Sequence, residues 1–225
     1  MSGKNALEID LESRKRRLEE LVREFLILIG EDPDREGLRD TPKRVAKMWF
    51  DELVYGYYRD PMEYIKTFSY EESDYNDSER IQRVDETIIV SGIPVRSVCE
   101  HHLLPIVGVA SIAYIPAEKV LGFSKFARIT EFFARRLQIQ ERLTNQLADF
   151  IYENLRARGV IVLIRGLHLC ALHRGVKEPL VTVTRAIRGV FAEDKDMRNE
   201  ILNIMLREIY TPKEIDIIVS SIKNL

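Results

Sequence analysis

The chain of 225 residues contains only two cysteines and four histidines, and all six fall into two short segments. They are Cys99, His101 and His102, followed by His168, Cys170 and His173. Cysteine sulfur and histidine nitrogen are the common protein ligands of zinc, and histidine also transfers protons near neutral pH. The two segments are therefore the first candidates for a chemical site.

Three of these side chains suit a catalytic zinc. Cys99 and His102 are three residues apart, so a turn would let both converge on one point. His168 and Cys170 are two apart, which places them on the same face of a predicted strand. Cys99, His102 and Cys170 together supply three ligands, the number that leaves one zinc position for water. Zinc would lower the pKa of that water to about 7.

Other interpretations of the cysteines stay open at this point. Both could be buried small hydrophobic residues. They could form a disulfide on oxidation, although a reducing cytosol disfavours it. One could be a nucleophile with a histidine base, which would leave the other cysteine without a role.

Several basic or hydroxyl side chains stand where a phosphate group could bind. They are Arg44, Lys47, Ser124, Lys125, Arg128 and Arg174. Residues 124–128 surround a predicted helix start, where backbone N–H groups favour an anion. Arg44 and Lys47 share one side of another predicted helix. A solvated helix face is the alternative, and the sequence alone does not bring these residues together.

Gln140 and Glu141 stand at a further predicted helix start. A carboxylate beside an amide could read the edge of a guanine ring. From the residues alone, a capping or surface role is the favoured interpretation of the pair.

Apolar spacing, Gly and Pro positions predict the elements that must hold these residues. The first expected helix covers 8–29 and stops at Gly30, and the second runs from a Thr41 cap, with Pro42 at its first position, to about Val54. The next two cover 125–137, with Ser124 as the cap, and 140–159, ending at Gly159. A last helix covers 195–209 and is followed by a short tail helix after Pro212. Successive strands are expected over 83–92, 93–102, 106–116, 160–172 and 179–187, and residues 71–80 form a predicted loop.

Grouped strands and grouped helices predict an α+β fold with a mostly antiparallel sheet. We divide the chain into an N-terminal helical region (1–70), a catalytic domain (71–210) and a C-terminal helical tail (211–225). The net charge of −2 gives no support for nucleic acid or an anionic membrane as partner. No apolar run is long enough to span a bilayer and no signal peptide is evident, so we expect a cytoplasmic protein.

Taken together, these segments resemble the GTP cyclohydrolase I family. The resemblance rests on "SVCEHHLLP", "YIP", "LGFSKFARI", "RRLQIQERLTNQL", "HLC" and "RGV", in that order and spacing. The helical "EDPDREGLRDTPKRVAKMW" also resembles the family's N-terminal region, so residues 20–209 are covered.

The resemblance implies a role for each matched residue. Cys99, His102 and Cys170 match the ligands of one Zn²⁺ per subunit, and His101 and His168 match the catalytic histidines. Glu141, with Gln140, matches the pair that holds guanine. The matches to triphosphate and ribose contacts are Ser124, Lys125, Arg128, Arg174, Arg44 and Lys47.

The resemblance also implies a reaction and an assembly. GTP and water become formate and 7,8-dihydroneopterin triphosphate, the first step of pterin and folate biosynthesis. The implied fold is the tunnelling fold, with an antiparallel sheet, helices packed on one face, and strands of several subunits forming a barrel. The implied oligomer is a decamer of two pentamers with active sites at subunit boundaries.

The chain departs from the family pattern at a few positions. Arg165 and Gly166 precede "HLC" where an acidic and a small residue are expected, and Arg185, Arg188 and His173 are unusual. A compensated change at a subunit interface and altered phosphate handling are the two interpretations. Two other functions remain in competition: a related enzyme that forms another pterin, such as a cyclic phosphate, and an inactive assembly protein stabilised by zinc.

Overall fold

A computed structural model describes residues 2–65, 67–69, 87–117 and 119–209. The chain separates into two compact units, Met1–Tyr58 and Arg59–Leu225. The predicted loop at 71–80, the domain border at residue 70 and the tail at 211–225 lie outside the described residues. Within the part of the chain that the structure describes, no helix combines the length and apolar character needed to cross a membrane.

The first unit is helical, as predicted. Helix α1 spans Ser2–Leu28, and Gly30 ends it with a φ of +89°. The amide of Glu31 donates to the carbonyl of Leu26 (2.9 Å), a bond typical of a glycine-terminated helix. Helix α2 spans Thr41–Lys47 and continues as a π-helical segment, Met48–Leu53, followed by a 3-10 turn at Tyr55–Tyr57. The predicted Thr41 cap is wrong by one residue: Asp40 precedes the helix, and its side chain makes no cap bond.

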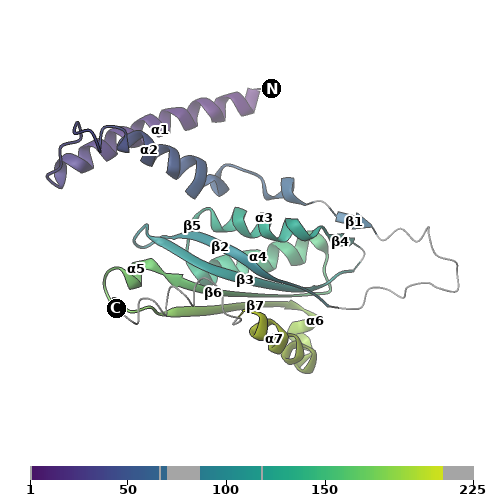
Figure 1. The fold of residues 1–225 in the computed structure, drawn as a ribbon. Helices are drawn as coiled ribbons and strands as arrows, with labels where there is room; N and C mark the ends of the chain where they lie inside the picture. Colours follow the sequence, from purple (N-terminus) through teal and green to yellow (C-terminus); the bar gives the residue numbers. More distant parts are fainter. Residues whose placement is uncertain (1, 66, 70–86, 118, 210–225) are drawn as a thin grey trace. The chain divides into compact units, whose positions relative to one another are not determined.

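The second unit is built on a five-stranded sheet in the order β5-β2-β3-β6-β7 (Figure 1). The long strands are β2 (Ile88–Cys99), β3 (Pro105–Ile115), β6 (Gly159–His168) and β7 (Val181–Gly189). All three pairings among them are antiparallel, which confirms the predicted sheet type. The short β5 (Leu137–Gln138) pairs with β2 in parallel. A separate pair joins β1 (Thr67–Ser69) to β4 (Lys119–Leu121), after a 3-10 turn at Pro61–Tyr64.

Two strand predictions need correction. Within the described residues, the two predicted strands on either side of Gly92 form the single strand β2 (Ile88–Cys99), because Gly92 takes a positive φ of 73° inside an irregularity of the β2–β3 register rather than making a turn. Strand β6 stops at His168, and Leu169–Leu172 form a one-turn helix, α5, instead of continuing the strand.

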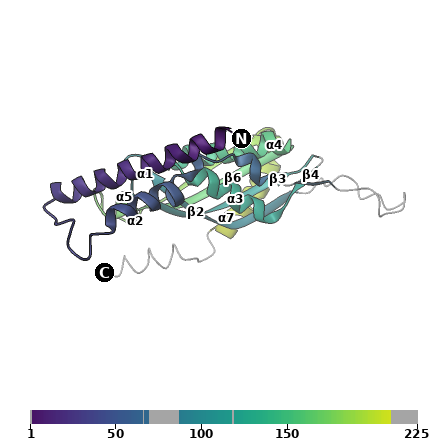
Figure 2. The same cartoon turned by 90° about the horizontal axis from the view of Figure 1, so that it is seen from above.

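Helices cover both faces of the sheet, so the prediction that they pack on one face is wrong. Helices α3 (Phe123–Ala134) and α4 (Gln140–Leu155) lie on one side, and α6 (Val190–Glu193) with α7 (Lys195–Ile209) lies on the other (Figure 1). Alternate residues of β6 divide accordingly: Val162 belongs to the core under α3 and α4, and Ile161 to the core under α7. Figure 2 views the sheet from the α3 side.

Helix ends also differ from the predictions in two places. Gly122 rather than Ser124 is the cap residue of α3, and Ser124 lies inside the first turn. Helix α4 ends at Leu155 because Arg156 turns into the left-handed region at φ 49°. The predicted stop, Gly159, instead begins β6, where an added Cβ would lie 2.8 Å from the Phe191 ring. The predicted helix over 195–209 is confirmed as α7.

Candidate active site and metal centre

The predicted metal ligands come together at one end of the sheet. One ligand atom from each of Cys99, His102 and Cys170 lies within 4.8 Å of the other two. Cys99 is the last residue of β2, and Cys170 lies in α5, just after β6 ends. Both strands pair with β3, whose first residues lie opposite these ends, which is why residues 71 positions apart meet.

A tight turn returns His102 to Cys99. The amide of Cys99 donates to the carbonyl of Leu104 (2.8 Å), and the amide of Leu103 donates to the carbonyl of Cys99 (2.9 Å). Leu103 takes a positive φ of 56° within this turn. The turn confirms the geometry expected for Cys99 and His102. The strand argument for Cys170 is wrong, because a helical turn rather than strand alternation brings it to the cluster.

The three donors fit zinc. The sulfurs of Cys99 and Cys170 are 3.6 Å apart, and both cysteines are free thiols. Two thiolates on a tetrahedral zinc, with Zn–S bonds of about 2.3 Å, are separated by about 3.8 Å. Burial, and then the hydrogen bond with Cys99, raise the pKa of the Cys170 thiol. A metal would therefore displace a proton from this thiol as it binds.

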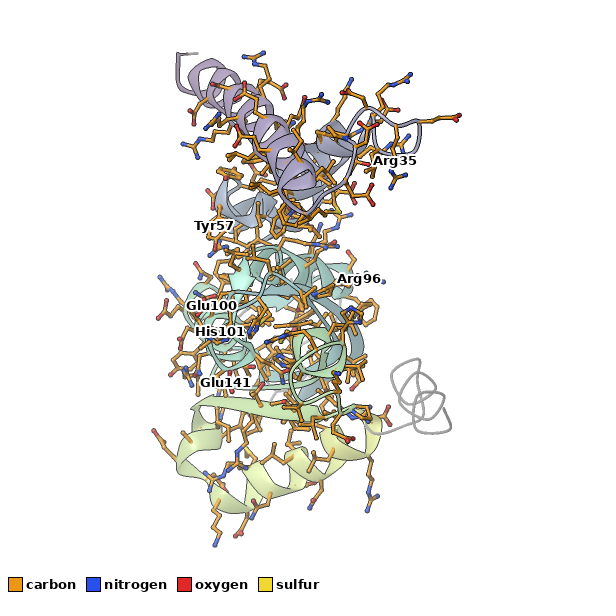
Figure 3. All side chains as sticks on the ribbon, turned by 90° about the vertical axis from the view of Figure 1, so that its left-hand side faces the viewer. Arg35, Tyr57, Arg96, Glu100, His101 and Glu141 are labelled. Atoms are coloured by element: carbon orange, nitrogen blue, oxygen red, sulfur yellow. The ribbon has the colours of Figure 1, made fainter. Side chains whose placement is uncertain are left out.

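His101 and Glu100 occupy the same turn. The His101 side chain is 65% exposed, and its Nε2 lies 3.9 Å from a carboxylate oxygen of Glu100. Glu100 also forms an ion pair with Arg142 of α4, and its amide donates to the carbonyl of Gln138 (3.1 Å). Figure 3 shows Glu100, His101 and Glu141 on one side of this unit. No role could be assigned to Glu100 from the sequence, because its partner Arg142 comes near it only in the folded structure.

His168 is half-buried at the end of β6. Its Nε2 lies 3.0 Å from Oε1 of Gln140. Burial lowers the pKa of His168, and the nearby Glu141 carboxylate offsets part of that shift. Gln140 is 1% exposed, so the surface interpretation is wrong for this residue, whereas Glu141 is exposed. The guanine contacts of the pair stay a prediction.

Arg174 joins the cluster, whereas the residues of α3 do not. The guanidinium of Arg174 lies 2.8 Å from Nε2 of His102. Ser124 lies in the first turn of α3, and Ala134 at the other end of the helix accepts a hydrogen bond from Ser97, close to the metal ligands. Ten residues of helix span about 15 Å. Ser124 and Lys125 therefore lie far from the metal ligands within one chain, and Arg128 is exposed on the same helix.

Arg44 and Lys47 are exposed on α2 of the other unit, where Arg44 lies 3.3 Å from Asp40. Among the departures from the family pattern, Arg188 is held by Asp149 (2.6 Å) and Asn145 (3.0 Å) of α4. This pairing favours a compensated structural change at residue 188. Arg165 is buried in β6, while His173 and Arg185 are exposed.

Comparison with known proteins agrees with the site. A family model described as GTP cyclohydrolase I matches residues 18–206. GTP cyclohydrolase 1 of Mycolicibacterium vanbaalenii is 48% identical over 195 residues, covering 85% of this chain and 91% of the relative. GTP cyclohydrolase 1 of Carboxydothermus hydrogenoformans is 48% identical over 193 residues, covering 85% and 94%. The chain therefore belongs to the GTP cyclohydrolase I family.

Proposed function

We propose that this protein is a zinc-dependent GTP cyclohydrolase I, which converts GTP and water to formate and 7,8-dihydroneopterin triphosphate. The observation that carries the proposal is the cluster of Cys99, His102 and Cys170, with ligand atoms within 4.8 Å, in a chain of this family. His101 and His168 flank the cluster on the same two segments.

The site residues have separate roles in the proposed reaction. Zinc, when bound, supplies a Lewis acid and a water of lowered pKa. His168, when its ring is protonated, gives a proton to the imidazole ring of the purine as that ring opens. His101, exposed on the turn, is the second proton carrier for formate release and for the ribose rearrangement that precedes ring closure. Glu141 orients guanine through a charge-assisted hydrogen bond, and Arg174 binds the ribose or triphosphate.

We further propose that each active site is shared between subunits of a homo-oligomer, a decamer of two pentamers built on the tunnelling fold. The position of Ser124 and Lys125, about 15 Å of helix from the metal end, supports this arrangement. A neighbouring subunit would bring its α3 to the cluster. β7, the terminal strand of the described sheet, offers the edge through which barrel strands could pair between subunits.

The test is to incubate the zinc-loaded protein with GTP and to measure formate, the product mass and pterin fluorescence after oxidation. We expect dihydroneopterin triphosphate, and we expect Cys170→Ala and His168→Ala to abolish its formation. His173→Ala, an exposed histidine outside the cluster, is the matched control that keeps activity. A cyclic phosphate pterin would show the related enzyme instead. No pterin at all would show an assembly protein.

A subunit-mixing experiment tests the shared site. Cys170→Ala and Lys125→Ala variants are each expected to be inactive alone. If the site is shared, refolding the two together restores part of the activity, because some boundaries then combine an intact cluster with an intact α3. Activity that stays absent in mixed oligomers, verified by differently tagged subunits, would show that one chain supplies both parts.

A further inference from the structure

We propose that Gln140 is a positioning residue that holds His168 with a proton on Nε2, so that Nδ1 is the nitrogen that exchanges protons with the substrate. This inference rests on the proposed function and adds the identity of the reacting atom. It replaces the expectation that the Gln140 side chain contacts guanine.

The carboxamide of Gln140 is enclosed on both sides. Its Nε2 donates toward the backbone carbonyl oxygens of Ile164 (3.0 Å) and Thr182 (3.1 Å), which belong to the neighbouring strands β6 and β7. Its Oε1 faces Nε2 of His168 at 3.0 Å. The residue is 1% exposed at the start of α4, so water does not compete for these bonds.

These partners fix which way the amide points. Backbone carbonyls can only accept hydrogen bonds, so the nitrogen of Gln140 must face Ile164 and Thr182. The reversed amide would place its oxygen against two carbonyl oxygens, and both carbonyls would lose the hydrogen bond that Gln140 donates. A buried polar group without a hydrogen-bond partner destabilises the folded state. The oxygen of Gln140 therefore faces His168.

The orientation of Gln140 decides the tautomer of His168. The amide oxygen has no proton to give, so the bond at 3.0 Å requires a proton on Nε2 of His168. A neutral imidazole carries one proton, so its lone pair is then on Nδ1. Because Nε2 is directed to a buried amide, Nδ1 is the nitrogen left to serve the substrate.

Gly166 makes room for this contact. A Cβ at residue 166 would lie 2.3 Å from Oε1 of Gln140, so the amide would have to leave the position in which it bonds to Ile164 and His168. The glycine that follows Arg165 in β6 is thus required by the side chain that orients His168. Gly166→Ala is a second, independent way to displace the acceptor without removing any hydrogen-bonding group.

Thr184 supplies the matched control. Its Oγ1 lies 3.1 Å from Nε2 of Gln140 and 2.6 Å from Oγ1 of Thr144. Thr184→Val removes a partner from the same amide but leaves both carbonyl acceptors and the His168 contact in place. A purely structural role for this network predicts similar losses in Thr184→Val and in the Gln140 variants.

The direct test is solid-state nitrogen-15 NMR on the zinc-loaded, full-length protein with labelled histidine. Signals of His168 are assigned from their loss in His168→Asn or, if that variant does not fold, in His168→Gln. We expect a protonated Nε2 and an unprotonated Nδ1 when the ring is neutral. Gln140→Met and Gly166→Ala are expected to mix the two tautomers, and Thr184→Val to leave the spectrum unchanged. An unprotonated Nε2 in the wild type would overturn the proposal.

Steady-state kinetics separate positioning from guanine binding. In Gln140→Met and Gly166→Ala we expect kcat to fall about 10- to 100-fold, part of the range that acid–base catalysis contributes, with KM for GTP changed less than about threefold. Gln140→Met that raises KM at an unchanged kcat would assign Gln140 to guanine instead. Equal losses in Thr184→Val would make the role structural. If the wild type releases no formate from GTP, the proposed function fails, while the NMR result still decides the tautomer.

Discussion

Removing the metal from the Cys99–His102–Cys170 cluster is expected to let the two cysteines form a disulfide. Their sulfurs are 3.6 Å apart in the free-thiol state, and a disulfide bond of about 2.05 Å needs an approach of roughly 1.5 Å. Cys170 is partly exposed on a one-turn helix, where small backbone movements can provide that shift. Bound zinc would prevent the reaction, because both sulfurs then serve as ligands.

The size of the effect follows from the separation of the cysteines in the sequence. They are 71 positions apart, so the disulfide would close a loop of that length in the unfolded chain. The chain-entropy relation gives about 4 kcal/mol of stabilisation for such a loop, less any strain in the folded state. For a chain of 225 residues this corresponds to a rise in Tm of roughly 10 °C. The oxidised, metal-free protein should therefore be more heat-resistant than the reduced, metal-free protein, and inactive.

The assay treats chelated and zinc-loaded protein with oxidised glutathione, alkylates the remaining thiols and measures the intact mass. We expect two unalkylated cysteines only in the chelated sample, a higher Tm for that sample than for the same metal-free protein after reduction, and recovery of activity after reduction and zinc addition. Cys99→Ala is the control, because its Cys170 can only form a mixed disulfide with glutathione. The reasoning is refuted if both thiols stay alkylatable without metal, or if zinc does not change the yield.

Three further outcomes follow from the packing. Glu100→Gln removes the charged partner of Arg142. Because the pair is partly exposed, we expect a loss of about 1 kcal/mol of transition-state stabilisation, measured as a three- to tenfold fall in kcat/KM. Adding Arg142→Met should cause little further loss, and additive losses would argue against coupling. Gly108→Ala places a Cβ 2.3 Å from a β6 carbonyl oxygen, so denaturant unfolding should show a loss of at least about 1–3 kcal/mol or no soluble protein. Leu147→Ala, in the fully buried core of α4, should cost about 2–5 kcal/mol, whereas the exposed Leu180→Ala should change stability by less than about 0.5 kcal/mol.

Most helices could be predicted because their signals are local. Gly30 ends α1 as expected, and α7 has the predicted bounds, since each is defined by apolar spacing and nearby residues. The error at Gly92 occurred where a longer-range contact decided the outcome. A glycine at residue 92 predicts a turn, but Gly92 lies within one continuous strand, because pairing with β3 continues on both sides of it.

Residue types and spacing alone made Cys99, His102 and Cys170 candidate metal ligands, and the structure brings their ligand atoms within 4.8 Å of one another. Only the tertiary structure decided how Cys170 arrives, through the α5 turn, and what Glu100 and Gln140 contact. Their partners lie 42 and 28 positions away, respectively, on elements that pack together only in the folded sheet. Candidate ligands can be recognised from residues that are close in the sequence, whereas the orientation of His168 depends on strands β6 and β7 meeting the start of α4.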